Sequence, residues 1–345
     1  MAERLRMVMY GIGHSHSPGK YRAMCSDPNV DVVGVCEPEA GTRDRVGSDT
    51  AFDGATWIDD PKSFLAGQSV NAVCVEGDEG RCSALALECI RSGKHLWYDK
   101  PAGDLATFRS VIKIARTGLL QVQMGYMLRY VEAFVSIGQW VRAGVLGNIF
   151  SMRGHMSTTS SSDRRGHAGY PGGIAFQLAP HMIDQVLWIL GGRPDRLTAL
   201  LRNDATPDFP RHADNTLIVM EYARAFAMID IAEMEVSPPA RRFEVYGTRG
   251  SAIVVEPFEP GTTVRLCLSA STTLPDGRTF DAGEHQIAMP PTPRSVSFSR
   301  ELAAFVRSVQ GEGPPDRTLD HELLVEETLH RAIAAGSRFH PFPSN

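Results

Sequence analysis

The chain has 345 residues, more than one hydrophobic core usually supports, and this length indicates two domains. It is 43% hydrophobic and 22% charged, the composition of an ordinary globular protein, and its formal net charge is -5. This charge gives no electrostatic reason to expect nucleic acid or an anionic membrane surface as a partner. No stretch approaches the roughly 18 continuous apolar residues that would span a bilayer.

The cysteines and the amino terminus indicate the cellular compartment of the protein. No Cys-x-x-Cys pair occurs, and several thiols lie in apolar runs, where a reduced thiol packs as a small hydrophobe. The amino terminus runs directly into a strand-like segment, without the pattern of a secretory signal. We therefore expect a reduced, cytoplasmic protein with no membrane partner. The six cysteines are Cys25, Cys36, Cys74, Cys82, Cys89 and Cys267.

Four short apolar or β-branched runs in the first third of the chain predict strands, at residues 7–10, 30–36, 72–75 and 95–98. Helix-like stretches lie between them, the clearest at residues 82–92. This alternation predicts a doubly wound parallel sheet of the Rossmann type, with a ligand crevice at the carboxyl ends of its strands. We expect residues 1–124 to form a nucleotide-binding domain.

Longer runs with period-two character follow residue 124, at residues 148–156, 215–222, 225–233 and 242–246. The chain ends in two helical segments, 299–310 and 320–335. Strands joined by short turns favour a mostly antiparallel sheet. We expect residues 125–345 to form an α+β domain with a large, open, mostly antiparallel sheet and helices on one face.

A glycine-rich turn follows the first strand. Gly11 and Gly13 suit a tight turn and a close approach of backbone to pyrophosphate. The third glycine of the dinucleotide fingerprint is missing, because His16 occupies its place. We expect this turn, followed by a helix amino terminus, to bind a dinucleotide, the alternative being an incidental turn. The predicted cofactor-binding residues of the turn are Gly11, Ile12, Gly13, His14 and Ser15.

Glu37 ends the second strand, 24 residues after Gly13, where a carboxylate can accept hydrogen bonds from ribose hydroxyls. A carboxylate there repels the 2'-phosphate of NADP, which usually pairs with an arginine. The nearest arginine in the following sequence, Arg43, is six residues on. We expect NAD as the cofactor, with NADP less favoured.

His14 and His16 could instead be metal ligands. Residues two apart on a helix point to different sides, and a catalytic zinc site requires a third ligand. We therefore expect no metal. Ser17 can cap the following helix and Pro18 suits its first turn, which explains the polar run without an ion.

Two further segments carry candidate chemistry. Lys100 lies at the carboxyl end of the fourth predicted strand, where it can donate to a substrate hydroxyl and stabilise a developing alkoxide. The alternative is a surface lysine before the turn residue Pro101. His181 follows Pro180, near which we expect a helix to begin, and a histidine there suits a general base. The alternative is a hydrogen-bonded structural histidine.

The three segments together resemble the oxidoreductases named after glucose-fructose oxidoreductase, inositol dehydrogenase and MocA, the Gfo/Idh/MocA family. The family pattern has Gly-x-Gly, a Glu-Lys-Pro after a later strand, and Gly-Gly-x-x-x-Asp-x-x-x-His. Residues 86–95, 124–130 and 147–155 are also similar, and the resemblance spans roughly residues 5–335. The matching segments here are Gly11-Ile12-Gly13, Asp99-Lys100-Pro101 and Gly172-Gly173 through Gln177 to His181.

The resemblance implies a Rossmann domain followed by an α/β domain whose open sheet often forms the oligomer interface, hence a homodimer or homotetramer. It implies a reaction on a sugar, polyol or related carbinol. Lys100 would orient the hydroxyl and contact the cofactor, and His181 would take its proton as hydride moves to nicotinamide. Gly77 and Asp99 are further cofactor candidates. The predicted substrate-binding residues are Tyr126, Arg129, His155, Arg164, His167 and Asp184, although residues 160–167 could equally be a solvated connection.

Two departures from the family pattern leave alternatives open. Gln177, the third candidate catalytic residue, stands in place of the family Asp. Residues 77–82 replace the usual Thr-Pro-Asn-x-x-His. An NAD-dependent dehydrogenase is the main hypothesis. A redox-assisted lyase would use transient oxidation to acidify a neighbouring C–H, and a dinucleotide-binding sensor would have no turnover.

Overall fold

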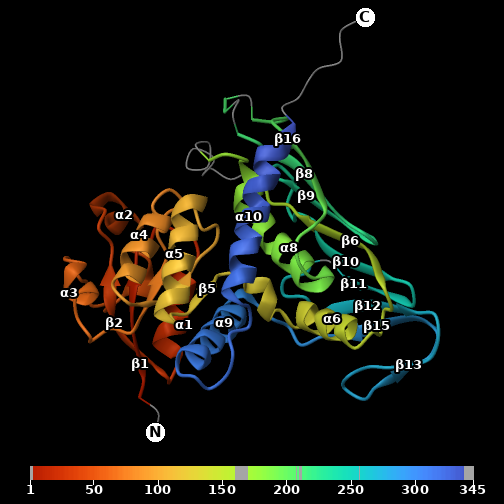
Figure 1. Cartoon of the computed structure of the whole chain (residues 1–345), viewed down its shortest axis with the longest axis horizontal. Coiled ribbons are helices and arrows are strands. Elements are labelled where there is room, and N and C mark those ends of the chain that lie inside the picture. The colour runs from red at the N-terminus through yellow and green to blue at the C-terminus, as the bar shows by residue number, and fades with distance from the viewer. Residues whose placement is uncertain (1–2, 160–169, 207, 210–211, 256, 338–345) are drawn as a thin grey trace, which may run out of the picture. The chain divides into compact units, whose positions relative to one another are not determined.

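The computed structural model describes residues 3–159, 170–206, 208–209, 212–255 and 257–337. The chain divides into two compact units (Figure 1). The first comprises Met1–Met127 and Arg294–Glu326, and the second comprises Leu128–Pro293 and Glu327–Asn345. A single boundary after residue 124 does not describe this division, because residues 294–326 return to the first unit and supply part of its core.

The first unit contains a parallel sheet with strand order β2-β1-β3-β4-β5. The order reverses at β1 and β3, so their carboxyl ends form a topological switch point. The predicted doubly wound sheet is confirmed. Its strands are β1 (Leu5–Tyr10), β2 (Val30–Cys36), β3 (Ala72–Val75), β4 (His95–Tyr98) and β5 (Val122–Met124), and its helices include α1 (Ser17–Ser26), α2 (Ala40–Val46), η1 (Thr50–Phe52), α3 (Lys62–Leu65), α4 (Cys82–Arg91) and α5 (Leu105–Gly118).

Helix α9 (Arg294–Val309) packs beside α1, although the two helices lie at opposite ends of the sequence (Figure 1). Phe298, Leu302 and Phe305 belong to the same buried core as Met7 of β1. Gly19 allows the close approach, since a Cβ there would lie 2.7 Å from the Phe298 ring. Helix α9 therefore completes the first unit.

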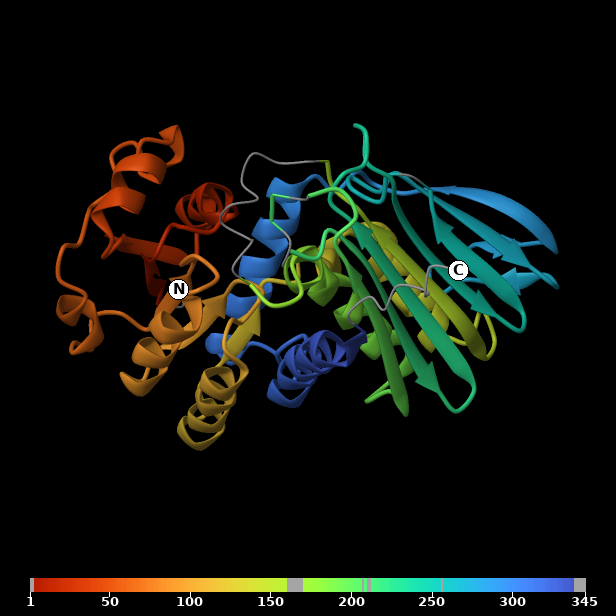
Figure 2. The ribbon, with the colours of Figure 1, turned by 90° about the horizontal axis from the view of Figure 1, so that it is seen from above.

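The second unit contains a nine-stranded sheet with order β15-β12-β11-β10-β6-β9-β8-β7-β16. Its neighbours are antiparallel except for the β6–β9 and β7–β16 pairs, which confirms the predicted mostly antiparallel sheet. Figure 2 shows its twist. The strands are β6 (Ile149–Met156), β7 (Arg196–Arg202), β8 (Asn215–Tyr222), β9 (Ala225–Ala232), β10 (Arg241–Gly247), β11 (Gly250–Val254), β12 (Thr263–Leu268), β15 (Gly283–Ala288) and β16 (Gly336–Ser337), and a separate short pair is β13 (Thr272–Thr273) with β14 (Thr279–Phe280).

Helices α6 (Glu132–Arg142) and α8 (Ile174–Leu190) lie on one side of this sheet (Figure 1). Gly154 of β6 faces α8, since a Cβ there would lie 2.9 Å from the Met182 sulfur. The opposite face carries exposed apolar side chains, including Leu200 and Phe226. Helix α10 (Leu319–Ala335) begins in the first unit and ends in the second.

The start of α8 differs from the prediction. We expected the helix to begin close to Pro180, but it begins at Ile174 and Pro180 lies inside it. Gly172 and Gly173 set the start, because both adopt positive φ and the Ile174 N–H then donates to the Ala213 carbonyl. His181 therefore lies in the second turn of the helix.

None of the helices within the described residues is long and apolar enough to cross a membrane.

Replacing Gly173 with alanine should destabilise the protein strongly. A Cβ at this position would lie 2.2 Å from the Ala213 carbonyl oxygen, a backbone atom that cannot move aside. We expect a loss of about 3 kcal/mol or more in the free energy of unfolding, from steric overlap added to the positive φ. Chemical denaturation of the variant and of the wild type measures this loss in the free energy of unfolding.

Gly192 is the matched control, because it also has positive φ but has open space around its missing Cβ. Gly192→Ala should cost only about 1 kcal/mol. Equal losses for the two variants would contradict the steric contact at Gly173.

Candidate functional site

The glycine turn lies against the loop that follows β3. A Cβ on Gly11 would lie 2.6 Å from the Gly77 Cα, and a Cβ on Gly13 would lie 2.8 Å from the Asp78 backbone nitrogen. The His14 N–H donates to the Glu76 carbonyl at 2.9 Å. Only glycine fits where these two backbones meet, so the turn is held at the switch point beside the amino terminus of α1.

Glu37 is bound to the same turn. Its Oε2 accepts the Ile12 N–H at 2.8 Å, and its Oε1 accepts the Glu39 N–H at 2.9 Å. The side chain is almost buried. The acidic end of β2 and the glycine turn therefore lie together, as binding of a dinucleotide requires.

The two histidines of the turn do not diverge. Their rings lie 4.5 Å apart, and both Nδ1 atoms approach Asp99 Oδ2, at 3.5 Å from His14 and 2.9 Å from His16. The prediction that the two side chains point to different sides is wrong, because both residues precede α1, which begins at Ser17. Potential ligand atoms of the three residues lie within 4.8 Å of one another. The Lys20 ammonium occupies the same carboxylate oxygen, however, and would repel a metal cation.

The start of α1 also differs in detail. Ser17 was expected to cap the helix, but its hydroxyl donates to the Ile12 carbonyl at 2.8 Å, so it ties the helix back to the turn. The residue at the cap position is His16, and Pro18 lies in the first turn of the helix, as predicted.

Lys20 is the centre of a fully buried ion network. Its Nζ lies 2.9 Å from Asp99 Oδ2, 3.0 Å from Glu76 Oε1 and 3.4 Å from Glu301 Oε1. The Trp97 indole N–H donates to Glu301 Oε1, and the ammonium lies 4.4 Å from the centre of the indole ring. One side chain of α1 thereby joins the carboxyl ends of β3 and β4 to α9.

Lys20 and the acidic residues of this network shift one another's pKa values. Burial disfavours the ammonium, yet the three carboxylates raise the pKa of Lys20 well above its usual range. Burial favours a neutral Asp99, but His14, Lys20 and His16 hold its pKa well below the usual range. Burial raises the pKa of Glu301 to about 7, although Lys20 opposes the shift. The Lys20–Asp99 pair is therefore ionised, and Glu301 titrates near neutral pH.

Lys100 lies beside this network. The backbone N–H of Lys100 donates to Asp99 Oδ1 at 2.7 Å, and the residue is 5% exposed. The alternative of a surface lysine is therefore wrong. Burial lowers the pKa of Lys100, an effect that Asp99 and Glu79 oppose. A desolvated ammonium at the carboxyl end of β4 is a strong donor toward a developing oxyanion.

Tyr126, a predicted substrate residue, is bonded inside the first unit. It is fully buried, and its hydroxyl donates to Glu326 Oε1 at 2.8 Å. Glu326 also accepts the backbone N–H of Ala102. Burial raises the pKa of Glu326 to about 7, while these two hydrogen bonds act against the shift. Glu326 thus holds the segment that immediately follows Lys100.

His181 and Gln177 lie on one face of α8, one turn apart, and are 2% and 8% exposed. Asp184 lies one turn further, but its carboxylate is paired with Arg129: Nε lies 3.1 Å from both carboxylate oxygens, and Nη2 lies 2.8 Å from Oδ1. Gln185 also donates to it. These two predicted substrate residues therefore bind each other and tie η2 (Met127–Tyr130) to α8.

His155 lies away from His181 within the second unit. Its neighbour Gly154 faces α8, so His155 points to the opposite face of the sheet. Its Nδ1 bonds Asp230 and its Nε2 bonds Glu235, each at 2.7 Å. The Asp230 hydrogen bond raises the pKa of His155, although burial opposes it. The structure does not bring His155 together with His181.

Ser15 is exposed, and Gly77 lies buried against the glycine turn. Arg164 and His167 lie outside the described residues. Lys100 belongs to the first unit and His181 to the second, so their joint role stays a prediction.

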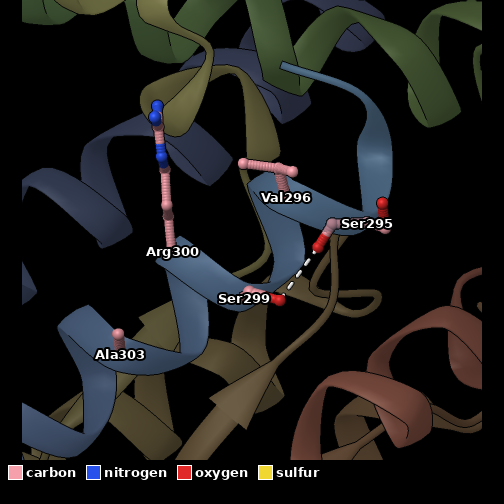
Figure 3. A pocket seen from close by; sticks show the side chains of 5 residues that line it. All are labelled: Ser295, Val296, Ser299, Arg300 and Ala303. Atoms are coloured by element: carbon pink, nitrogen blue, oxygen red, sulfur yellow. Dashed lines mark hydrogen bonds between the residues drawn. The ribbon is translucent and has the colours of Figure 1, made fainter. Parts of the chain in front are cut away.

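A shallow hollow of about 330 Å³ lies along α9 (Figure 3). It lies on the side of the helix away from the buried Phe298 and Glu301. None of the predicted site residues lines it. The lining residues are Ser295, Val296, Ser299, Arg300 and Ala303.

Sequence reasoning missed the residues that support the site. Glu76 could have been found, because it is an acidic residue directly after a buried strand of the parallel sheet. Lys20 gave no signal, since a lysine on a helix is usually exposed. Glu301 and Glu326 lie too far along the chain for any local pattern to connect them with Asp99 and Lys100.

Removing the ammonium of Lys20 should destabilise the fold in a pH-dependent way. Lys20→Met leaves three carboxylates buried without their cation, which typically costs about 3–5 kcal/mol. Without the cation the folded-state pKa values of these carboxyls rise above the unfolded values. The free energy of unfolding of the variant then falls as pH rises through these raised pKa values. Its loss relative to wild type is therefore larger at about pH 8 than at about pH 5.

Urea denaturation at the two pH values measures this deficit. Lys20→Met/Glu301→Gln should recover part of the loss, because one buried charge is removed with the cation. A deficit of equal size at both pH values would contradict the network.

Glu326→Gln should weaken the dependence of stability on pH. The folded-state pKa of Glu326 is about 7, above the ordinary 4.5, so its contribution is complete below pH 4.5 and lost as pH rises through 7. Glutamine keeps the neutral hydrogen-bonding form and removes this loss. Thermal unfolding between about pH 4.5 and pH 7 measures how steeply stability changes with pH. The exposed Glu312→Gln is the control. Identical slopes for wild type and Glu326→Gln would contradict the shifted pKa.

Part of the chain matches a known domain family, and two known proteins are similar to it in sequence. Residues 134–253 match the model of the GFO/IDH/MocA C-terminal domain. Inositol 2-dehydrogenase 1 of Saccharopolyspora erythraea is 28% identical over 194 residues, which cover 56% of this chain and 56% of that protein. Myo-inositol 2-dehydrogenase of Thermotoga maritima is 23% identical over 260 residues, 74% of each chain. The aligned part thus spans about half the length of the first relative.

A solved structure shares the fold of nearly the whole chain. GenD2 from gentamicin A biosynthesis, crystallised in complex with NAD, has a TM-score of 0.77 to this chain at 22% identity. The match covers 97% of this chain and 95% of that one, and it shows a shared fold. The domain match over residues 134–253 and the two sequence relatives support a Gfo/Idh/MocA oxidoreductase.

Proposed function

We propose that this protein transfers hydride between a secondary hydroxyl of a sugar, polyol or related carbinol and the nicotinamide of NAD. The observation that carries the proposal is the grouping of the glycine turn, the Glu37 carboxylate and buried Lys100 at one edge of a parallel sheet. Two relatives are named as inositol dehydrogenases, which supports a polyol as the substrate class.

The residues at this edge fit a dinucleotide. Gly11 and Gly13 keep the turn free of side chains, and the amino terminus of α1 follows it with its N–H groups and positive dipole end. Glu37 has its carboxylate fixed by two backbone N–H groups and retains lone pairs for ribose hydroxyls. NAD, when bound here, supplies the hydride acceptor.

The chain's own groups then have separate tasks. Lys100 donates to the substrate oxygen and stabilises the negative charge that develops there. His181 takes the hydroxyl proton as a general base. Gln177, one turn away on α8, supplies a hydrogen bond in place of a carboxylate, so it can orient the imidazole without stabilising its charged form.

The open face of the second sheet supports assembly into a homodimer or homotetramer. Leu200 and Phe226 on this face are 44% and 43% exposed. Light scattering measures the mass in solution, and a monomer would contradict this part of the proposal.

Turnover tests the proposed roles. A panel of inositols, sugars and polyols is assayed with NAD and with NADP, following nicotinamide absorbance and product mass. Lys100→Met and His181→Ala should each lower kcat about 10²- to 10⁴-fold on the best substrate. The exposed Lys113→Met is the matched control and should keep full activity.

Intact turnover in both site variants would contradict the assignment. A changed product mass without accumulation of reduced cofactor would instead identify a redox-assisted lyase. Binding of NAD without turnover of any compound would favour the sensor.

A further inference from the structure

An arginine lies at the acidic end of the proposed dinucleotide site. Arg81 Nη1 is 3.5 Å from Glu39 Oε2 and 3.9 Å from Glu37 Oε1, and the side chain is 40% exposed. Arg81 immediately precedes α4. Arg81 is 44 residues beyond Glu37 in the sequence, so no local pattern connects the two.

The backbone of Arg81 is fixed relative to the glycine turn. Asp78 Oδ1 accepts the N–H groups of Gly80 and Arg81, at 3.0 and 3.1 Å. The Asp78 backbone in turn lies against Gly13. The same loop therefore contacts the turn and delivers a cation to Glu37.

Arg43, the arginine that the sequence suggested, is engaged elsewhere. Its Nη1 bonds Asp59 at 2.6 Å, and its guanidinium lies 4.6 Å from the centre of the Trp57 ring. Arg81 is thus the arginine placed to act on a group bound at Glu37.

We infer that Arg81, held by Glu37 and Glu39, sets how strongly this site discriminates against NADP. Glu37 repels a 2'-phosphate, and together with Glu39 it attracts the guanidinium that would otherwise pair with that phosphate. Neutralising both acids removes the repulsion and releases the arginine. The inference rests on the proposed function, because it concerns the ribose end of the same dinucleotide.

Calorimetric titration of the full chain with NAD and with NADP tests this without relying on turnover. Glu37→Gln/Glu39→Gln should bind NADP at least about tenfold more tightly than wild type. Adding Arg81→Ala should abolish the gain, whereas adding Arg43→Ala should leave it intact. Arg81→Ala alone should weaken NADP binding and change NAD binding less than about threefold.

The outcomes separate the two proposals. Wild-type protein that is folded by circular dichroism but binds neither dinucleotide would overturn the proposed function. Wild type that binds NAD, with a gain for NADP that survives Arg81→Ala, would overturn only the role of Arg81. If the double variant does not fold, Glu39→Gln alone tests the same point. It should give a smaller gain that also disappears with Arg81→Ala, and a gain that persists would overturn the role of Arg81.

Discussion

The buried Lys20 ammonium is the interaction on which the first unit depends. Burying three carboxylates is unfavourable unless a cation and further donors compensate for lost hydration. Lys20 does this from α1, with help from the Trp97 indole and the two histidines. The close fit extends to Gly125, where a Cβ would lie 2.9 Å from Lys20 Nζ. Lys20 thereby holds together the ends of β3 and β4, the glycine turn and α9. Lys100 is the next residue after Asp99 in the chain.

This constraint separates residues that present chemistry from residues that hold them. Glu37 and Lys100 follow strands of the sheet at its carboxyl edge. Two backbone N–H groups hold the Glu37 carboxylate, and Asp99 accepts the backbone N–H of Lys100. Glu76, Glu301 and Glu326 lie behind that edge and set its geometry and charge. Two of them, Glu301 and Glu326, have a pKa of about 7, so the support itself changes charge near neutrality.

The sequence predicted what local patterns encode. Short apolar runs predicted the parallel sheet. The spacing predicted that Glu37 lies beside the glycine turn, where it accepts the Ile12 N–H, because both segments follow strands of one sheet. The sequence could not predict contacts between distant segments, such as Trp97 with Glu301, 204 residues apart. Two local predictions are wrong. His14 and His16 lie in a turn, so helical geometry does not describe their side chains. Helix α8 begins after two glycines with positive φ and not near Pro180.

The central claim is that the carboxyl edge of the first sheet binds a dinucleotide in one orientation. A crystal structure of the full chain grown with NAD tests it most directly. The account predicts pyrophosphate over Gly11 and Gly13, the adenosine ribose at Glu37, and nicotinamide beside Lys100. Density for NAD at another surface, with this edge occupied only by solvent, would contradict the account.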